Sequence, residues 1–304
     1  MSPLVRFRLI LLAIAVNTGT ATAVAGVFGD GDPANGVEDD RRTVSEGSAL
    51  PWADSWYRSG GTVVCDGAVR GSATLLASRS DRLPIEGMVI ATAAHVLYDL
   101  KRLRRWEQCA FHYLGLGALP GHRAVLRRDR MLVGDFDPAS DPASPHRGVN
   151  DWAFAWLGPA WRPPFGQAGL EPVSAEGIVL GKALLGLLAW HGDAGEISVS
   201  AGCGAVFSGP GDLGGGVWAS QLLDDCDSGV GASGGGMVVA HGDGPRLVAI
   251  RGGQHWDSAA WPAERWPQGP PPGARWDPKR FTNYARAFDD PLLTRLAEWL
   301  ASLK

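Results

Sequence analysis

Three short segments, far apart in the chain, carry residue types that could together perform nucleophilic catalysis. Ser233 lies between glycines in the run 231–236, where a tight turn of the backbone would leave its hydroxyl exposed. A serine hydroxyl is a weak nucleophile near neutral pH, so this hypothesis requires a general base. His95 is the candidate base, because it follows the apolar run 88–94 and would be held in a short helical turn at the end of a buried strand.

A carboxylate is needed to orient such a histidine and to stabilise its protonated form. Asp151 begins the strongly apolar segment 151–157, where a buried carboxylate without a partner would be costly. Pairing with His95 would explain its position. We therefore predict a catalytic triad of Ser233, His95 and Asp151, with the backbone N–H groups of Gly231 and Ser233 forming an oxyanion hole.

The composition predicts a globular protein rich in short strands. The chain has 304 residues, a formal net charge of -4 and 45% hydrophobic residues, which together are enough to build a sizeable core. The 42 glycines and 21 prolines shorten helices and multiply turns. Because the charge is slightly negative and offers no basic stripe for phosphates, we expect no nucleic-acid partner.

The first 25 residues have the order of a cleavable secretory signal. Arg6 and Arg8 precede the apolar run 9–16, and small residues follow up to Ala23 or Ala25. The apolar run is too short to span a bilayer. We expect a secreted or periplasmic protein with no membrane attachment after residues 1–25 are removed.

The four cysteines predict two disulfides, because an even number outside the cytosol normally pairs. Three pairings are possible, and we prefer Cys65 with Cys109 and Cys203 with Cys226, since each bond then stays within one half of the chain. No two of these cysteines have the Cys-x-x-Cys spacing typical of zinc sites. We predict neither a metal nor an organic cofactor.

The chain divides into two β-rich units with flanking segments. Residues 26–48 are glycine-rich and acidic and would form a pro-segment or a flexible N-terminal arm. A first β unit covers 49–157, a proline-rich connector covers 158–172, and a second β unit covers 173–289 and contains a Trp/Pro-rich loop at 256–277. Residues 290–304 predict a C-terminal helix, with Asp290 as the N-cap and Pro291 as the first helical residue.

The three motifs together resemble those of a known family. Ala91-Thr-Ala-Ala-His95, Asp151-Trp-Ala and Gly231-Ala-Ser233-Gly-Gly follow one another in the order His, Asp, Ser, and look like the signature motifs of chymotrypsin-like (trypsin-like) serine peptidases. Further short segments, among them Asp40-Arg-Arg42 and Trp190-His-Gly-Asp193, are similar to those of the secreted bacterial glutamyl endopeptidase (V8-like) branch. The resemblance covers residues 40–255.

This resemblance implies an all-β fold of two antiparallel six-stranded Greek-key barrels, residues 49–157 and 173–289, followed by the C-terminal α-helix. The triad would lie in the cleft between the barrels. The sequence departs from the family at two places. Ala232 stands where animal digestive relatives carry an aspartate that pairs with a newly freed N-terminus, and Gly236 replaces the ending with proline that usually follows the serine motif.

The P1 side chain has three possible binding modes. The resemblance puts Ser228 and Arg251 near the positions that bind an acidic side chain in glutamyl endopeptidases, and a guanidinium could clamp a carboxylate. Asp227 could instead attract Lys or Arg. Gly252 and its neighbour Gly253 could also leave an open apolar slot, and the residues themselves do not separate these possibilities.

We therefore predict an exported serine endopeptidase that hydrolyses peptide bonds through an acyl-enzyme. Its partner would be a protein or peptide substrate, and we expect it to act as a monomer. Two alternatives remain: a catalytically inactive chymotrypsin-fold module for binding or adhesion, which the Trp/Pro-rich loop 256–277 could serve, and an esterase that uses the same triad.

Overall fold

The structure is a computed structural model whose described residues fall in two β-rich halves. It describes residues 28–29, 42–44, 56–77, 87–115, 122–140, 145–164, 169–176, 185–208, 220–241, 244–257, 259–260, 262 and 274–303. The expected signal 1–25 and most of the segments 26–48 and 256–277 lie outside these residues. Within the described part, no helix is long and apolar enough to cross a membrane.

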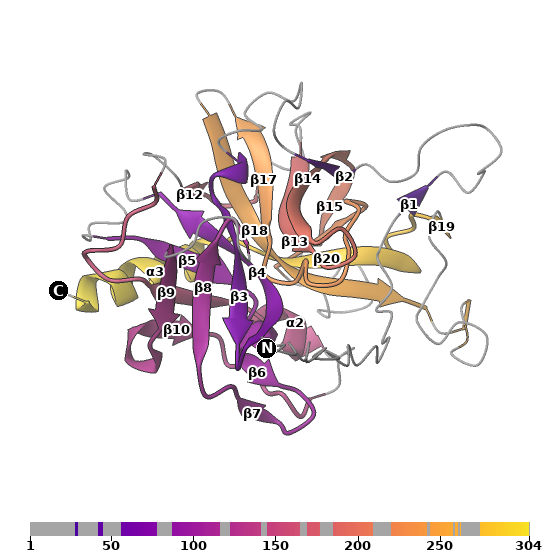
Figure 1. Ribbon diagram of the computed structural model, residues 1–304. Coiled ribbons are helices and arrows are strands. Elements are labelled where there is room, and N and C mark those ends of the chain that lie inside the picture. The colour runs from indigo at the N-terminus through magenta and orange to yellow at the C-terminus, as the bar shows by residue number, and fades with distance from the viewer. Residues whose placement is uncertain are drawn as a thin grey trace, which may run out of the picture.

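The N-terminal half forms one curled antiparallel sheet (Figure 1). Some of its strands alternate apolar and polar residues, and others are continuous apolar stretches rich in Val, Thr and aromatic residues. Both patterns suit a pleated sheet whose inner face is buried. In spatial order they are β10 (Met131–Val133), β11 (Ala153–Trp156), β5 (Val89–Thr92), β4 (Ala68–Leu76), β3 (Gly60–Cys65), β8 (Cys109–Tyr113) and β9 (Arg123–Leu126).

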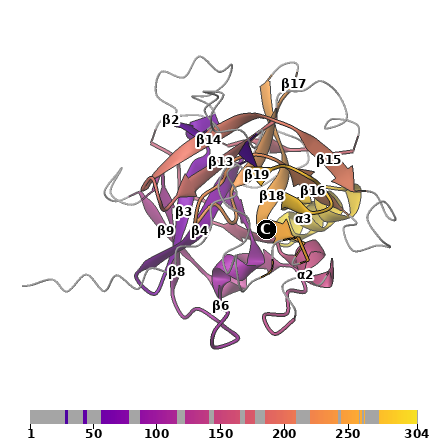
Figure 2. The ribbon, with the colours of Figure 1, turned by 90° about the vertical axis from the view of Figure 1, so that its right-hand side faces the viewer.

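The C-terminal half forms a second, larger curled sheet (Figure 2). Its main strands pair antiparallel, and β12 (Glu171–Pro172) from the connector adds to β18 in parallel. The spatial order is β15 (Ala205–Ser208), β16 (Gln221–Asp224), β20 (Phe281–Ala287), β18 (Gly244–Trp256), β17 (Gly236–His241), β13 (Leu185–His191), β14 (Glu196–Cys203) and β2 (Arg42–Val44).

The predicted all-β fold with two antiparallel sheets and a C-terminal helix is thus the observed architecture. In the described residues the sheets have seven and nine strands instead of six each. The larger number arises because short edge strands join the sheets, among them β2 from the N-terminal arm and β12 from the connector.

Short elements complete the fold. They are the 3-10 turns η2 (Ala94–Leu97) and η3 (Arg128–Arg130), the helix α2 (Pro145–Asn150), and the strand pairs β6 (Tyr98–Asp99) with β7 (Arg104–Arg105) and β1 (Phe28–Gly29) with β19 (Ala274–Arg275).

The C-terminal helix α3 (Asp290–Ser302) begins one residue earlier than predicted. Asp289, not Asp290, is the N-cap, because its carboxylate accepts a hydrogen bond from the N–H of Leu292 at 2.9 Å. The helix buries Leu292, Leu296 and Leu300 in the apolar core shared by the two sheets. These leucines are spaced four residues apart and therefore lie on one face of the helix.

Both disulfides join the cysteines in the preferred sequential order. Cys65 bonds to Cys109 across the neighbouring strands β3 and β8, and Cys203 at the end of β14 bonds to Cys226 just after β16. Each bond therefore closes a loop within one half of the molecule. The second bond also anchors the segment that leads from β16 to Ser233.

Candidate active site

The register of the first sheet brings His95 and Asp151 to the same edge. Thr92, the last residue of β5, pairs with Ala153, the first residue of β11. Residues that follow β5 and residues that precede β11 must therefore lie side by side. His95 lies in η2, three residues beyond Thr92, and Asp151 lies two residues before Ala153.

The contact between His95 and Asp151 has the geometry that the sequence hypothesis requires. His95 Nδ1 lies 2.6 Å from Asp151 Oδ2, and the His95 backbone N–H donates to Asp151 Oδ1 at 2.8 Å. The Asp151 side chain is 4% exposed, whereas that of His95 is 20% exposed. The buried carboxylate thus fixes the ring orientation while the imidazole still reaches solvent, which a proton-transfer group needs.

Ser233 lies in the turn between β16 and β17, and its turn packs against the end of β5. Its carbonyl oxygen accepts a hydrogen bond from the N–H of Ser72 at 2.7 Å. The next residue, Gly234, approaches so closely that an added Cβ would lie 2.3 Å from Thr92 Oγ1 and 3.0 Å from the Ala93 nitrogen. The partly exposed serine therefore sits beside the segment that carries His95.

The hydroxyl of Ser233 bonds to a carbonyl in this structure. Ser233 Oγ donates to the carbonyl oxygen of Gly252 at 3.2 Å, and no hydrogen bond between Ser233 and His95 occurs among the described residues. Gly252 is the extra residue of a β-bulge, since Arg251 pairs with Ala285 and Gly253 pairs with Tyr284. Such a bulge interrupts the ladder, which leaves a carbonyl available next to the turn.

The turn before Ser233 exposes two backbone donors. In the described part of the chain, the N–H groups of Gly231 and Ser233 have no protein acceptor. Gly231 has a φ of +89° and an added Cβ would lie 2.5 Å from the Trp190 ring, so the turn at this position requires glycine. Two such N–H groups, separated by one intervening residue, can bind an oxyanion.

Sequence reasoning missed Ser72, which ties this turn to both sheets. Ser72 Oγ donates to the carbonyl of Gly231 at 2.7 Å and accepts from the N–H of Trp190 at 2.8 Å. Ser72 occurs in the segment Gly71-Ser-Ala-Thr-Leu, but its distance along the chain from Ser233 gave no indication that it contacts the turn that bears Ser233.

The candidate P1 residues lie on two segments of the second sheet. Ser228 is buried near the start of the turn, and Arg251 is 1% exposed on β18. The guanidinium of Arg251 forms a bidentate ion pair with Asp224. Nη1 donates to Oδ2 at 3.0 Å and Nη2 donates to Oδ1 at 2.6 Å. Gly252 lies against the ring of Tyr284, whose Cε2 would be 2.3 Å from an added Cβ.

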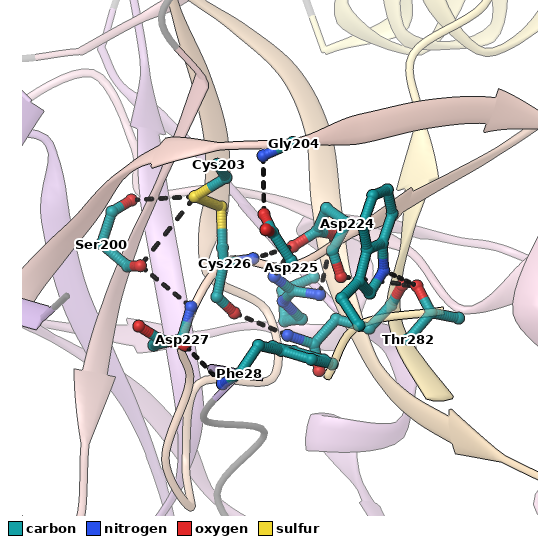
Figure 3. A network of polar contacts seen from close by, with 12 residues as sticks. Phe28, Ser200, Cys203, Gly204, Asp224, Asp225, Cys226, Asp227 and Thr282 are labelled. Carbon is teal, nitrogen blue, oxygen red and sulfur yellow. Dashed lines mark hydrogen bonds and ion pairs between the residues drawn. A yellow bond between two sulfur atoms is a disulfide. The ribbon is translucent and has the colours of Figure 1, made fainter. Parts of the chain in front are cut away.

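A network of polar contacts holds the segment 224–227 that leads into the turn (Figure 3). Asp227 donates from its N–H to Ser200 Oγ at 2.9 Å, and its Oδ1 accepts from the N–H of Phe28 at 2.8 Å. Asp224 also accepts from the N–H of Cys226 at 3.0 Å. Burial raises the pKa of the Asp224 carboxyl, and the Arg251 guanidinium acts against this.

Removing the Asp224 carboxylate should destabilise the protein strongly. Asp224→Ala would leave the Arg251 guanidinium buried without a counter-charge, which costs about 3–5 kcal/mol of unfolding free energy. The double variant Asp224→Leu with Arg251→Met should recover most of this loss. Urea unfolding with intact disulfides measures both.

The exposed ion pair Arg127–Asp129 offers a control, since its side chains are 56% and 62% exposed. Asp129→Ala should leave the urea midpoint unchanged. An Asp224→Ala midpoint equal to that of the wild type would show that Arg251 finds another partner.

No group of three or more His, Cys, Asp or Glu side chains that could hold a metal ion occurs within the described ranges. The groups that the described residues bring to the site are the side chains of His95, Asp151 and Ser233 and the two backbone donors.

Comparisons with known proteins identify the fold. No family model and no curated protein matches the sequence. Among solved structures, a Glu endopeptidase in complex with MPD is similar with a TM-score of 0.54 and 13% identity, over 87% of this chain and 99% of that one.

Two further structures are similar over most of the chain. A thermostable serine protease, AL20, from an extremophilic microorganism has a TM-score of 0.51 and 15% identity, over 83% of this chain and 99% of its own. The protease Anisep from Arthrobacter nicotinovorans has a TM-score of 0.51 and 12% identity, over 81% of this chain and 97% of its own. Likenesses at this identity establish the fold, and this chain therefore has the chymotrypsin-like fold of these protease structures.

Proposed function

We propose that the protein is an exported serine endopeptidase that acts through Ser233, His95 and Asp151. The observation that carries the proposal is the 2.6 Å contact between His95 Nδ1 and a buried Asp151 carboxylate, next to the turn that bears Ser233. A fold without catalytic activity has no physical need for a buried carboxylate aimed at a partly exposed imidazole. The fold shared with three protease structures supports the same proposal.

The proposed reaction is acyl transfer. Rotation about the Ser233 side chain breaks its bond to Gly252 and turns Oγ toward His95 Nε2. Oγ attacks the peptide carbonyl carbon while its proton passes to Nε2, and the resulting oxyanion is bound by the N–H groups of Gly231 and Ser233. The C–N bond then breaks as Nε2 returns the proton to the leaving amine, and water hydrolyses the acyl-enzyme by the same steps.

Asp151 orients the imidazole throughout this cycle. It holds the proton on Nδ1, so that Nε2 is free to accept one from Ser233, and it stabilises the imidazolium that forms. Export is proposed from the predicted signal 1–25, and the two disulfides support it because such bonds persist in oxidising compartments.

For the P1 side chain, we propose weak acidic selectivity through Arg251 and Ser228. Because Asp224 neutralises Arg251, a substrate carboxylate would meet a neutral pair and not a free cation. Nε of Arg251 has no hydrogen-bond partner among the described residues, and this N–H could donate to a carboxylate or to an amide alike. We therefore expect Glu to be favoured over Gln by less than about tenfold, or 1.4 kcal/mol.

Digestion of a denatured proteome, with mass spectrometry of the released peptides, tests activity and P1 preference together. Cleavage after Glu and Gln supports the proposal, and cleavage that the Ser233→Ala variant also produces would refute the assignment. Cleavage after Lys or Arg would instead implicate Asp227, and cleavage after large apolar residues would implicate a slot beside Gly252.

An inactive binding module is the second candidate. The hydrogen bond from Ser233 Oγ to Gly252, in place of one to His95, favours it. Complete absence of released peptides under conditions where the protein is folded would support this candidate.

A further inference from the structure

The N-terminal arm reaches the second sheet close to the candidate oxyanion turn. Strand β2 forms the edge of this sheet and pairs antiparallel with β14, with Ser200 opposite Arg42 and Ser198 opposite Val44. Figures 1 and 2 both show β2 lying along β14. Ser200 in turn accepts the Asp227 N–H, so this edge lies beside the segment that leads to Ser233.

The side chain of Arg42 forms an ion pair with Asp193, in the turn that follows β13. Its Nη1 donates to both carboxylate oxygens of Asp193, at 2.9 Å and 2.7 Å. The Arg42 side chain is 13% exposed and that of Asp193 is 42% exposed. An ion pair with one partner so exposed contributes little to the free energy of unfolding. We therefore expect its effect to lie in the position of the backbone that it contacts.

The ion pair covers Gly229, two residues before Gly231. A Cβ added to Gly229 would lie 2.1 Å from Asp193 Oδ1 and 2.8 Å from Arg42 Nη1, so the pair occupies the space that a side chain would need. The pair therefore sits directly against the backbone at this position.

The turn that bears Asp193 also bonds to the same stretch of backbone. The Gly229 N–H donates to His191 Nδ1 at 2.8 Å, and the Gly192 N–H donates to the carbonyl of Val230 at 2.6 Å. The peptide that ends in the Gly231 N–H is thus held from outside by residues 191–193. Arg42, in strand β2 of the N-terminal arm, binds this turn through its ion pair with Asp193.

We propose that Arg42 is a positioning residue for the oxyanion hole, and that residues 42–44 belong to the active enzyme and not to a discarded pro-segment. The proposal rests on the proposed peptidase function. Donors that bind a transition state must be fixed in advance, and displacement by about 1 Å can cost on the order of 100-fold in rate. Loosening Gly229 would let the neighbouring Gly231 donor move.

The test compares Arg42→Ala with the wild type in kinetics and in amide exchange. We expect kcat to fall by about tenfold or more with KM within about twofold, because the oxyanion donors act on the transition state and not on bound substrate. Amide exchange in the peptide 229–233 should become faster. The urea midpoint should remain close to that of the wild type, because the pair is partly exposed.

Two further variants and a control separate positioning from general damage. Gly229→Ala pushes the Asp193 carboxylate aside without changing either partner and should reproduce the loss in kcat. Arg42→Lys keeps the charge, and one ammonium can replace Nη1, which alone donates to both Asp193 oxygens, so this variant should keep kcat within about threefold of the wild type. Arg127→Ala is the control, because Arg127 also contacts both oxygens of one carboxylate but belongs to the first half of the molecule. It should change neither kcat nor amide exchange in the peptide 229–233.

Wild-type kcat and exchange in Arg42→Ala would overturn the proposal, as would an active secreted enzyme whose N-terminal residue lies beyond Arg42. If the wild type cleaves no peptide, the proposed function fails while faster exchange at 229–233 in Arg42→Ala still supports the positioning contact. Unchanged exchange in that case refutes it.

Discussion

Ser233→Ala should lower kcat by about 10⁵- to 10⁶-fold, because the substitution removes the nucleophile on which the other triad members act. Peptide hydrolysis by the purified variant, followed by mass spectrometry over hours, measures the residual rate. The remaining activity should exceed that of water alone, since the backbone N–H groups at positions 231 and 233 are still present in the variant. A fluorophosphonate probe should label the wild type and leave the variant unlabelled.

Folding of this variant should be nearly unchanged. Among the described residues the hydroxyl makes one hydrogen bond, to the carbonyl of Gly252, and losing it costs about 1 kcal/mol. Ser140→Ala serves as a matched control, since Ser140 Oγ also donates to a carbonyl oxygen, that of Asp137, at 2.7 Å on the surface. Turnover within tenfold of the wild type, or continued labelling at one probe per chain, would exclude Ser233 as the nucleophile.

Asp151→Asn should lower kcat by about 10⁴-fold while the protein stays folded. An amide at this position presents an N–H as well as an oxygen to Nδ1, so the ring no longer needs to keep its proton there. Nε2 would then carry the proton and could not accept one from Ser233. The imidazolium would also lose its counter-charge.

Steady-state kinetics across pH measures this effect together with its pH dependence. KM should change by no more than a few-fold, because Asp151 is buried behind His95 and does not face the substrate. Asp129→Asn provides the control, at an exposed carboxylate whose side-chain ion pair is with Arg127, and it should leave kcat unchanged. More than a tenth of wild-type kcat in Asp151→Asn would show that His95 is oriented by another group.

Much of the candidate site was predictable from local sequence because its parts are short motifs with strong local physics. The apolar runs that flank His95 and Asp151 had to form buried strands, and a buried carboxylate needs a partner. The glycines around Ser233 likewise predicted a tight turn. The sequential disulfides followed from keeping each bond within one β unit.

Other contacts could not be predicted, because they depend on the register between strands distant in the chain. Asp224 and Arg251 are 27 residues apart, and nothing in their spacing reveals that one neutralises the other. Ser72 lies 159 residues from Gly231 and bonds to it only because the two sheets meet at this turn. The N-cap of α3 was misplaced by one residue, since Asp289 and Asp290 are both suitable and only the helix start separates them.

The sequence by itself therefore determined which side chains could do chemistry and that two β units would carry them. Tertiary structure alone decided where those side chains find their partners: the bulge at Gly252 offers its carbonyl to Ser233, and the edge strand β2 brings Arg42 to Asp193. The physical reason is that apolar periodicity and turn residues act over a few positions along the chain. Sheet register and bulges, by contrast, result from packing between segments that no local pattern relates.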